Sequence, residues 1–128
     1  MNTTNLEIVT PEGLIFSGNV KSVTFPGSEG EFGVLPNHAA LLTSLKVGVI
    51  DIELENGSKE PVAINWGFVK VEETKITVLA DGAVAINGES ESEIAAALEK
   101  AKSLIQSMSD SNVALAVAKV DSMSKKIY

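Results

Sequence analysis

Hydrophobic and polar residues alternate along much of the first two thirds of the chain, which is the pattern of half-buried β-strands. Residues 50–55, Ile-Asp-Ile-Glu-Leu-Glu, alternate without a fault and predict a strand whose three acids face water. Asn56 and Gly57 follow, a dipeptide typical of hairpin turns, and residues 61–66 predict the return strand. Ile50, Ile52 and Leu54 are predicted to face inward, and Val62, Ile64 and Trp66 are predicted to share one face of the return strand.

Other short segments rich in β-branched and aromatic residues lie on both sides of this hairpin. Residues 11–13, Pro-Glu-Gly, predict a turn, Pro26 is expected to end a strand because it cannot donate to a ladder, and Gly67 permits a bend. The predicted strand segments are residues 6–10, 14–16, 19–25, 68–71 and 75–80. About nine to ten short antiparallel strands with turns at close intervals predict a closed β-sandwich or barrel.

The pattern changes near Gly88, beyond which the apolar period becomes about 3.6 and glycine and proline are absent. Ser90 and Glu93 fit a capping box at the start of a first helix, and residues 107–112 form a polar break before a second one. The first apolar stripe is Ile94, Ala97, Leu98, Ala101, Leu104 and Ile105, and the second is Val113, Val117, Val120 and Ile127.

These stripes predict an antiparallel two-helix hairpin over residues 85–128, after a β-sandwich domain over residues 1–84, in an α+β fold. Full burial of a large apolar side chain stabilises by about 1.5 to 3 kcal/mol, and alanine contributes less. Helices of this length are marginal alone in water, so the pair must pack on something. We expect modest docking on the sandwich, which would allow another partner to compete for the same stripe.

Charge and composition narrow the possible functions of this 128-residue chain. Its net charge of −7 should repel phosphate backbones and anionic lipid, so nucleic acid is not an expected partner. No apolar run approaches the roughly 18 residues of a membrane helix, and the N-terminus has no basic-then-apolar signal, so neither membrane insertion nor secretion is expected. The absence of cysteine excludes disulfides and thiolate metal sites.

Residues 23–48 form the most punctuated stretch, with three glycines at every third position and two prolines, and they predict a series of shaped turns. A phosphate loop is disfavoured because Glu29 and Glu31 occupy the stretch and no Gly-Lys-Ser or Gly-Lys-Thr follows. A contact loop with an exposed Phe32 and a purely structural turn stay open as alternatives. The flanking residues expected in the core are Val23, Phe25, Leu41, Leu42 and Leu45.

Groups that could carry catalysis are sparse. His38 is the only histidine, and neither a nucleophilic triad nor a zinc site is built from one histidine alone, so a structural or interface role is favoured. The acidic pairs Glu53 with Glu55 and Glu72 with Glu73 are interpreted as solvated surface. No metal and no cofactor are therefore expected, and the protein is not expected to be an enzyme.

Several motifs follow one another in a specific order across nearly the whole chain. They are Phe25-Pro26-Gly27, Glu29-Gly30-Glu31-Phe32-Gly33-Val34-Leu35-Pro36, His38-Ala39, Leu41-Leu42-Thr43, Leu45-Lys46, Gly48, Gly67-Phe68-Val69 and Thr77-Val78-Leu79-Ala80-Asp81. In their order they closely resemble the signature of the epsilon subunits of F-type ATP synthases.

The resemblance implies a non-catalytic subunit of the rotating central stalk, peripheral to the cytoplasmic face of the bacterial inner membrane. Its sandwich would bind the gamma subunit and the ring of c subunits, and its hairpin would fold on the sandwich or extend into the catalytic alpha/beta head and restrain ATP hydrolysis. The implied c-ring contacts are Ser28, Glu29, Gly30, Glu31 and Phe32, and the implied gamma contacts are His38, Ala39 and Leu42. The implied regulatory residues are Ile94, Leu98, Val113, Val117, Lys119, Lys125 and Lys126.

The chain departs from the family pattern in two places. Asn37 replaces a usual glycine and Ala40 a usual proline, which changes the stiffness of a turn without changing the fold. Some members bind ATP through an Ile/Leu-Asp-x-x-Arg-Ala motif at the start of the hairpin. Here the matching positions include Glu91, Ser92, Ala95 and Ala96, without the arginine, so weak or no ATP binding is expected.

Two other classes of function are weighed against this resemblance. A small β-sandwich hydrolase or sugar-binding enzyme would need convergent polar groups in a pocket, and the sequence offers only scattered acids. A free-standing module that binds a small ligand is the other alternative. Association with a gamma-type subunit would distinguish the epsilon-subunit interpretation from these two alternatives.

Overall fold

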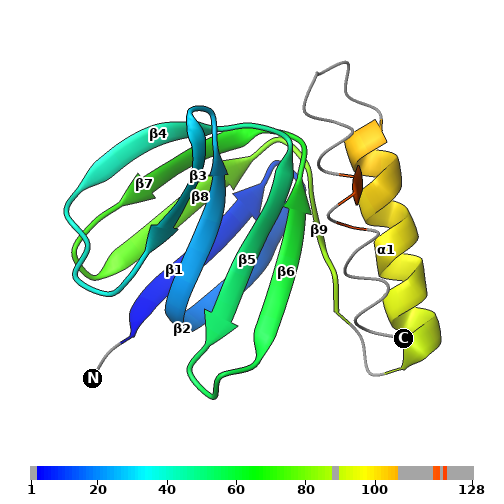
Figure 1. Cartoon of the computed structure of the whole chain (residues 1–128), viewed down its shortest axis with the longest axis horizontal. Helices are drawn as coiled ribbons and strands as arrows, with labels where there is room; N and C mark the ends of the chain where they lie inside the picture. Colours follow the sequence, from blue (N-terminus) through cyan, green and yellow to red (C-terminus); the bar gives the residue numbers. More distant parts are fainter. Residues whose placement is uncertain (1–2, 88–89, 107–116, 119, 121–128) are drawn as a thin grey trace.

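The computed structural model describes residues 3–87, 90–106, 117, 118 and 120 (Figure 1). Within these residues the strands are β1 (Thr4–Thr10), β2 (Gly13–Gly27), β3 (Gly30–Val34), β4 (Leu41–Leu45), β5 (Gly48–Leu54), β6 (Lys59–Ile64), β7 (Gly67–Val71), β8 (Lys75–Ala80) and β9 (Ala83–Ala85). One helix, α1 (Glu91–Gln106), follows them. The predicted order, a β-sandwich and then a helical segment, is confirmed.

The strands close into two layers because β2 belongs to both of them. The order is β1-β8-β7-β4-β2-β5-β6-β9, β3 also pairs with β2, and β1 pairs with β2 as well as with β8. The first part of β2 lies beside β1, its second part lies beside β5, and its last residue, Gly27, is opposite Leu45 of β4. The pairings are antiparallel except that of β1 with β8, which is parallel, whereas the sequence predicted an antiparallel sandwich throughout.

β2 is longer than the sequence predicted. The two expected strands, residues 14–16 and 19–25, form one continuous strand that extends through Pro26. Gly18 does not interrupt it because this residue is paired with Leu6 of β1. Pro26 is tolerated near the end of the strand, where its carbonyl oxygen accepts a hydrogen bond of 2.9 Å from the amide of Lys46.

Alternate residues of the strands fill the space between the layers. The largest fully buried side chains include Leu6, Ile8, Phe25, Ile50, Ile52, Ile64 and Ile76. The predicted inward positions Ile50 and Ile52 are confirmed, Val62 and Ile64 are buried with them, and Leu54 is only half-buried at the end of β5. The sandwich core therefore follows the period of two in the sequence.

The prediction that Trp66 shares one strand face with Val62 and Ile64 is wrong. β6 ends at Ile64, and Trp66 is 44% exposed. The alternation breaks at Asn65, whose side-chain Oδ1 accepts hydrogen bonds of 2.8 Å from the amides of Trp66 and Gly82. Asn65 thereby joins the β6–β7 connection to the β8–β9 connection and turns Trp66 outward.

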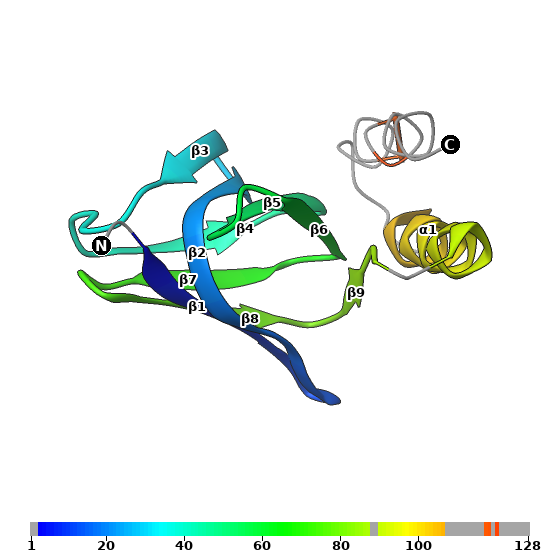
Figure 2. The ribbon, with the colours of Figure 1, turned by 90° about the horizontal axis from the view of Figure 1, so that it is seen from below.

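Helix α1 packs on the face of β5, β6 and β9 that points away from the sandwich core. Leu98, Ala101 and Ile105 are buried there, at the spacing that the predicted stripe requires. The sheet side of this contact consists of Val47, Val49, Ala63, Val84 and Ile86. Figure 2 shows α1 beside the β6–β9 edge of the sandwich.

The predicted second helix lies largely outside the described residues. Val117, Ala118 and Val120 have helical backbone conformation, Val120 is buried and Val117 packs against the same cluster as α1. The implied regulatory residues Val113, Lys119, Lys125 and Lys126 lie outside the described residues. One helix of the predicted hairpin is thus confirmed.

Candidate partner-binding surfaces

Most of residues 23–48 form strands where the sequence predicted a series of turns, and residues 35–40 connect β3 to β4. β2 and β3 are joined by a two-residue turn, Ser28 and Glu29, with Gly27 opposite Gly30. Gly30 has a φ of +129°, in the range that favours glycine. Ser28, Glu29 and Glu31 are exposed, so four of the five residues implied as c-ring contacts, Ser28 to Glu31, lie together at the tip of this β2–β3 hairpin, and the fifth, Phe32, lies inside the ladder opposite Phe25 (Figure 1).

The tip of the β2–β3 hairpin is fixed to strand β4. The amide of Ser28 donates to the carbonyl oxygen of Ser44 at 3.1 Å, and their hydroxyl oxygens lie 2.7 Å apart. The expectation of an exposed Phe32 is wrong, because its half-buried ring packs on Phe25 with 5.5 Å between the ring centroids. Phe32 therefore stiffens the hairpin from its inner side.

The residues implied as gamma contacts lie at the start of β4 and in the connection before it. His38 is half-buried and its Nδ1 lies 2.6 Å from the carbonyl oxygen of Ala39. Leu42 is 71% exposed, so its expected place in the core is wrong, whereas Leu45 is buried. Asn37 adopts a φ of 65°, a left-handed conformation that asparagine tolerates in place of the family's glycine.

An apolar row crosses the outer face of the layer formed by β1, β8, β7 and β4. The ladder places Val9 opposite Leu79, Leu79 opposite Phe68, and Phe68 opposite Ser44. Phe68 is 49% exposed and Leu79 is 57% exposed. Trp66 extends the row, with its ring centroid 6.1 Å from that of Phe68 in an edge-to-face arrangement. We call Val9, Trp66, Phe68 and Leu79 the outer apolar row.

Sequence reasoning missed the outer apolar row, although a signal for it exists. In residues 75–80 the outward positions are Lys75, Thr77 and Leu79, so the alternation places one leucine on a polar face. In residues 67–71 the same alternation places Phe68 beside Lys70. Leu42 of the implied gamma contacts belongs to this face as well, opposite Lys70.

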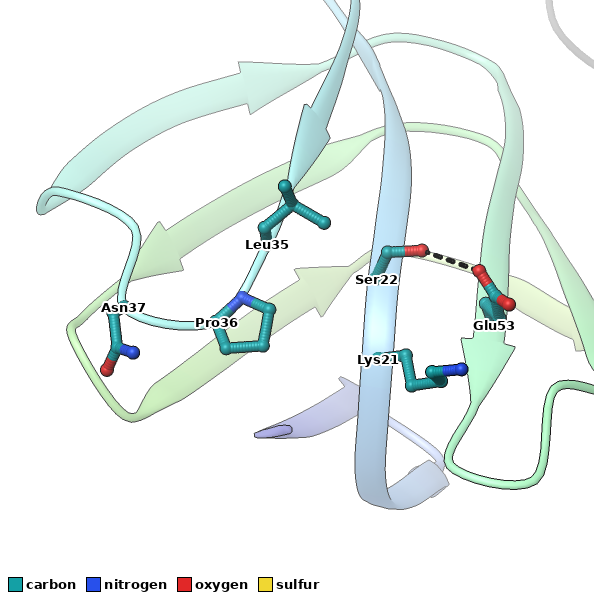
Figure 3. A pocket seen from close by; sticks show the side chains of 6 residues that line it. All are labelled: Lys21, Ser22, Leu35, Pro36, Asn37 and Glu53. Carbon is teal, nitrogen blue, oxygen red and sulfur yellow. Dashed lines mark hydrogen bonds between the residues drawn. The ribbon is translucent and has the colours of Figure 1, made fainter. Parts of the chain in front are cut away.

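A shallow pocket of about 390 Å³ lies on another side of the sandwich (Figure 3). Its lining residues are Lys21, Ser22, Leu35, Pro36, Asn37 and Glu53. The Ser22 hydroxyl donates to Glu53 Oε1 at 3.3 Å, and Lys59 pairs with the same oxygen at 3.5 Å. These polar groups satisfy one another, which is the arrangement of a stabilised surface and not of convergent catalytic groups.

The described residues offer few groups for metal binding or for membrane insertion. No cluster of three or more histidines, aspartates or glutamates that could hold a metal ion occurs in the described part of the chain. Among the same residues, no helix has the length and apolar character needed to cross a bilayer.

The start of α1 carries the positions that match the ATP motif of some relatives of the implied family. Glu91, Ser92 and Ala96 are exposed and Ala95 is half-buried. The amide of Glu93 donates to the Ser90 hydroxyl at 3.3 Å, which confirms the N-cap half of the predicted capping box. Two glutamates in the first turn complement the helix dipole and oppose the approach of a phosphate.

Comparison with known proteins identifies the family. The profile for "ATP synthase, Delta/Epsilon chain, beta-sandwich domain" matches residues 3–86. The chain belongs to the ATP synthase epsilon chain family. The epsilon chain of Nitratiruptor sp. is 63% identical over 116 residues, 91% of this chain and 90% of its own. That of Campylobacter fetus is 61% identical over 118 residues, 92% of each chain.

Solved structures agree with the family. The chain matches a chain of the Euglena gracilis mitochondrial ATP synthase with a TM-score of 0.63 and 26% identity, over 93% of this chain and 73% of that one. A Tetrahymena thermophila mitochondrial ATP synthase structure of the central stalk and c-ring matches in fold, with a TM-score of 0.52 and 18% identity over 62% of this chain and 64% of that one. As an epsilon chain, the protein is a non-catalytic subunit of ATP synthase, which confirms the family resemblance and removes the hydrolase alternative.

Proposed function

We propose that this epsilon chain acts as a rotor subunit of the central stalk, which links gamma to the c-ring at the cytoplasmic face of the bacterial inner membrane. The observation that carries the proposal is the outer apolar row. Exposed apolar patches on a folded subunit mark sites for another protein, and this row continues toward the implied gamma contact Leu42. Gamma is therefore assigned to the outer face of β1, β8, β7 and β4.

The proposal assigns the c-ring to Ser28, Glu29, Gly30 and Glu31 at the tip of the β2–β3 hairpin. Two contacts between Ser28 and Ser44 join this tip to β4, whose Ser44 lies at the end of the outer apolar row. A subunit that transmits torque between two partners needs stiff connections between its two contact surfaces. The short ladder and the Ser28–Ser44 contacts support that role.

The helical segment, residues 85–128, is proposed as a regulatory element that is separable from the sandwich. Its first helix buries three side chains, Leu98, Ala101 and Ile105, against the sheet, and this limited number supports modest docking. A helix held in this way can leave the sheet at limited cost and extend toward the catalytic head, where it would restrain hydrolysis. Ile94 and Leu98 face the sheet in the docked arrangement, so a competing partner would bind the same stripe.

Binding and activity measurements test the proposal. Residues 1–88 are expected to fold and to bind purified gamma with the affinity of the full chain, since the outer apolar row lies within them. The assembled synthase with the truncated chain should hydrolyse ATP faster than the enzyme with the full chain. Unchanged hydrolysis would contradict the inhibitory role alone, and absence of gamma binding by the full chain would contradict the rotor role.

ATP binding by this subunit is a separate part of the proposal. The matching positions lack the arginine that would meet phosphate, and the first turn of α1 adds Glu91 and Glu93. Calorimetry of the full chain with ATP should therefore show no binding in the micromolar range. A micromolar dissociation constant would contradict this part and leave the rotor role intact.

A further inference from the structure

A second shallow pocket, of about 360 Å³, opens on the outer face beside Trp66, the only tryptophan of the protein. The residues that form it come from the β1–β2 hairpin, from β7 and β8, and from the connections that follow β6 and β8. The lining residues include the apolar side chains of Val9, Pro11, Trp66, Phe68 and Leu79, and the carboxylate of Asp81. Figure 2 shows the tip of the β1–β2 hairpin projecting past the sheet, and Pro11, in the turn of this hairpin, is one of the lining residues.

Contacts within the subunit itself fix the position of Trp66. Its amide donates to Asn65 Oδ1 at 2.8 Å, and its carbonyl oxygen accepts from the amide of Asp81 at 3.0 Å. On one side the indole meets the Phe68 ring edge-to-face, with 83° between the ring planes. A pre-organised aromatic side chain loses little conformational freedom on binding, and tryptophan is enriched among residues that dominate interface energies.

Among the described residues that line this pocket, Asp81 has the only ionisable side chain. Its Oδ2 accepts a hydrogen bond of 3.0 Å from Asn65 Nδ2, and Oδ1 accepts none from the described residues. Lys75, on the same face, is paired with Glu7 at 3.1 Å. The pocket thus combines apolar walls, an aromatic ring and one carboxylate, in a protein with a net charge of −7.

We propose that this pocket binds a basic side chain of the gamma subunit, with its aliphatic part on the apolar walls and its charged end between Trp66 and Asp81. A cation over an indole ring is attracted by the π-electrons, and a carboxylate beside it adds an ion pair. Arginine fits best, because its planar guanidinium stacks on aromatic rings and pairs with carboxylates. The inference rests on the proposed contact of the outer face with gamma, and it names the chemistry of that contact.

The single tryptophan gives a direct readout of occupancy. Full-length protein is titrated with purified gamma while the Trp66 emission spectrum is recorded, and the same titration of Trp66→Phe provides the blank for gamma's own fluorescence. Saturable change of the emission maximum toward shorter wavelength is expected, since the half-exposed ring becomes covered. Binding without any change in the emission of Trp66 would overturn the inference and leave the rotor role standing.

Affinity measurements separate the ring from the charge. Trp66→Ala should weaken gamma binding by about tenfold or more, and Trp66→Phe should retain most of the affinity because it keeps an aromatic face. Asp81→Asn should weaken binding about threefold to fivefold at low salt, and the deficit should shrink at high salt. Glu55→Gln, which removes an exposed charge from the β5–β6 turn, is the matched control and should leave affinity unchanged.

The affinities of the Asp81→Asn and Trp66→Ala variants for gamma can each overturn the inference. If Asp81→Asn behaves like Glu55→Gln at every salt concentration, the basic side chain is excluded from this pocket. If Trp66→Ala binds gamma as the natural chain does, the pocket is not part of the contact. Urea unfolding of every variant shows whether the fold is kept, and failure of the natural chain to bind gamma would overturn both this inference and the rotor role.

Discussion

The two layers of the sandwich both carry apolar residues on their outer faces, but the described chain covers only one of these faces. On the layer of β5, β6 and β9, Val49, Ala63 and Val84 lie beneath α1. On the layer of β1, β8, β7 and β4, Trp66, Phe68 and Leu79 are exposed, and no element among the described residues packs over them. The difference supports the two proposals made above, a regulatory role for the helix on the first face and a contact with another subunit on the second.

The largest effect is expected where a charge is placed under α1. Ala101 is fully buried between the helix and the sheet, so Ala101→Asp would bury an unpaired carboxylate at a cost of about 3 to 5 kcal/mol. The helix should leave the sheet, while the sandwich stays folded. Hydrogen exchange should show loss of protection in α1 alone. Ala96→Asp, on the exposed side of the same helix, is the control and should keep that protection.

A smaller effect is expected from a hydroxyl on the covered face. Val49→Thr keeps the shape of the side chain but buries a polar group beneath α1, which should cost about 1 to 3 kcal/mol. Urea unfolding followed by far-ultraviolet circular dichroism measures the loss. An unchanged unfolding midpoint would mean that water reaches this contact and that α1 does not cover Val49.

A methyl group at Gly82 tests how closely α1 approaches the sandwich. A Cβ there would lie 2.9 Å from Leu104 Cδ1 and 3.1 Å from Asn65 Nδ2. Leu104 can shift because the contact is at the end of its side chain, so Gly82→Ala should weaken helix docking by only about 1 kcal/mol. Limited proteolysis of the helical segment should become faster. Equal proteolysis rates for the natural chain and the Gly82→Ala variant would show that Leu104 does not pack against Gly82.

The smallest change in stability is expected on the uncovered face. Leu79→Thr, matched to the change at Val49, should alter the free energy of unfolding by less than about 0.5 kcal/mol, because Leu79 is already exposed. The same variant should bind gamma more weakly in a pull-down or calorimetric titration. A loss of stability equal to that of Val49→Thr would contradict the difference between the two faces.

Local patterns predicted much of the fold. The unbroken alternation of residues 50–55, the turn at Asn56 and Gly57, and the helical stripe through Leu98 and Ile105 all describe the chain correctly, because each depends on neighbours close in sequence. The two predicted segments of β2 merge instead, because β1 and β5 supply ladder partners along its whole length. Such partners are distant in sequence and leave no local signal.

The residues of the candidate surfaces also include some that local sequence placed correctly and some whose placement depends on contacts distant in sequence. Ser28 and Glu29 were placed correctly at an exposed turn, since glycine and acid content is a local property. A period of two through Asn65 predicts Trp66 on the face of Val62 and Ile64, but the Asn65 side chain accepts a hydrogen bond from the amide of Gly82 and the strand ends before Trp66. Leu42 was placed in the core, although the pairing of β4 with β7 directs it outward, opposite Lys70.

The sequence by itself determined the class of fold, the position of the helical segment and the family, because strand and helix periods and ordered motifs are written along the chain. Tertiary structure alone decided which apolar residues are covered. Leu79 and Val49 are both aliphatic strand residues, yet one is exposed and the other lies beneath α1. Burial depends on which segment packs over a face, and that choice is made by contacts between residues far apart in the chain.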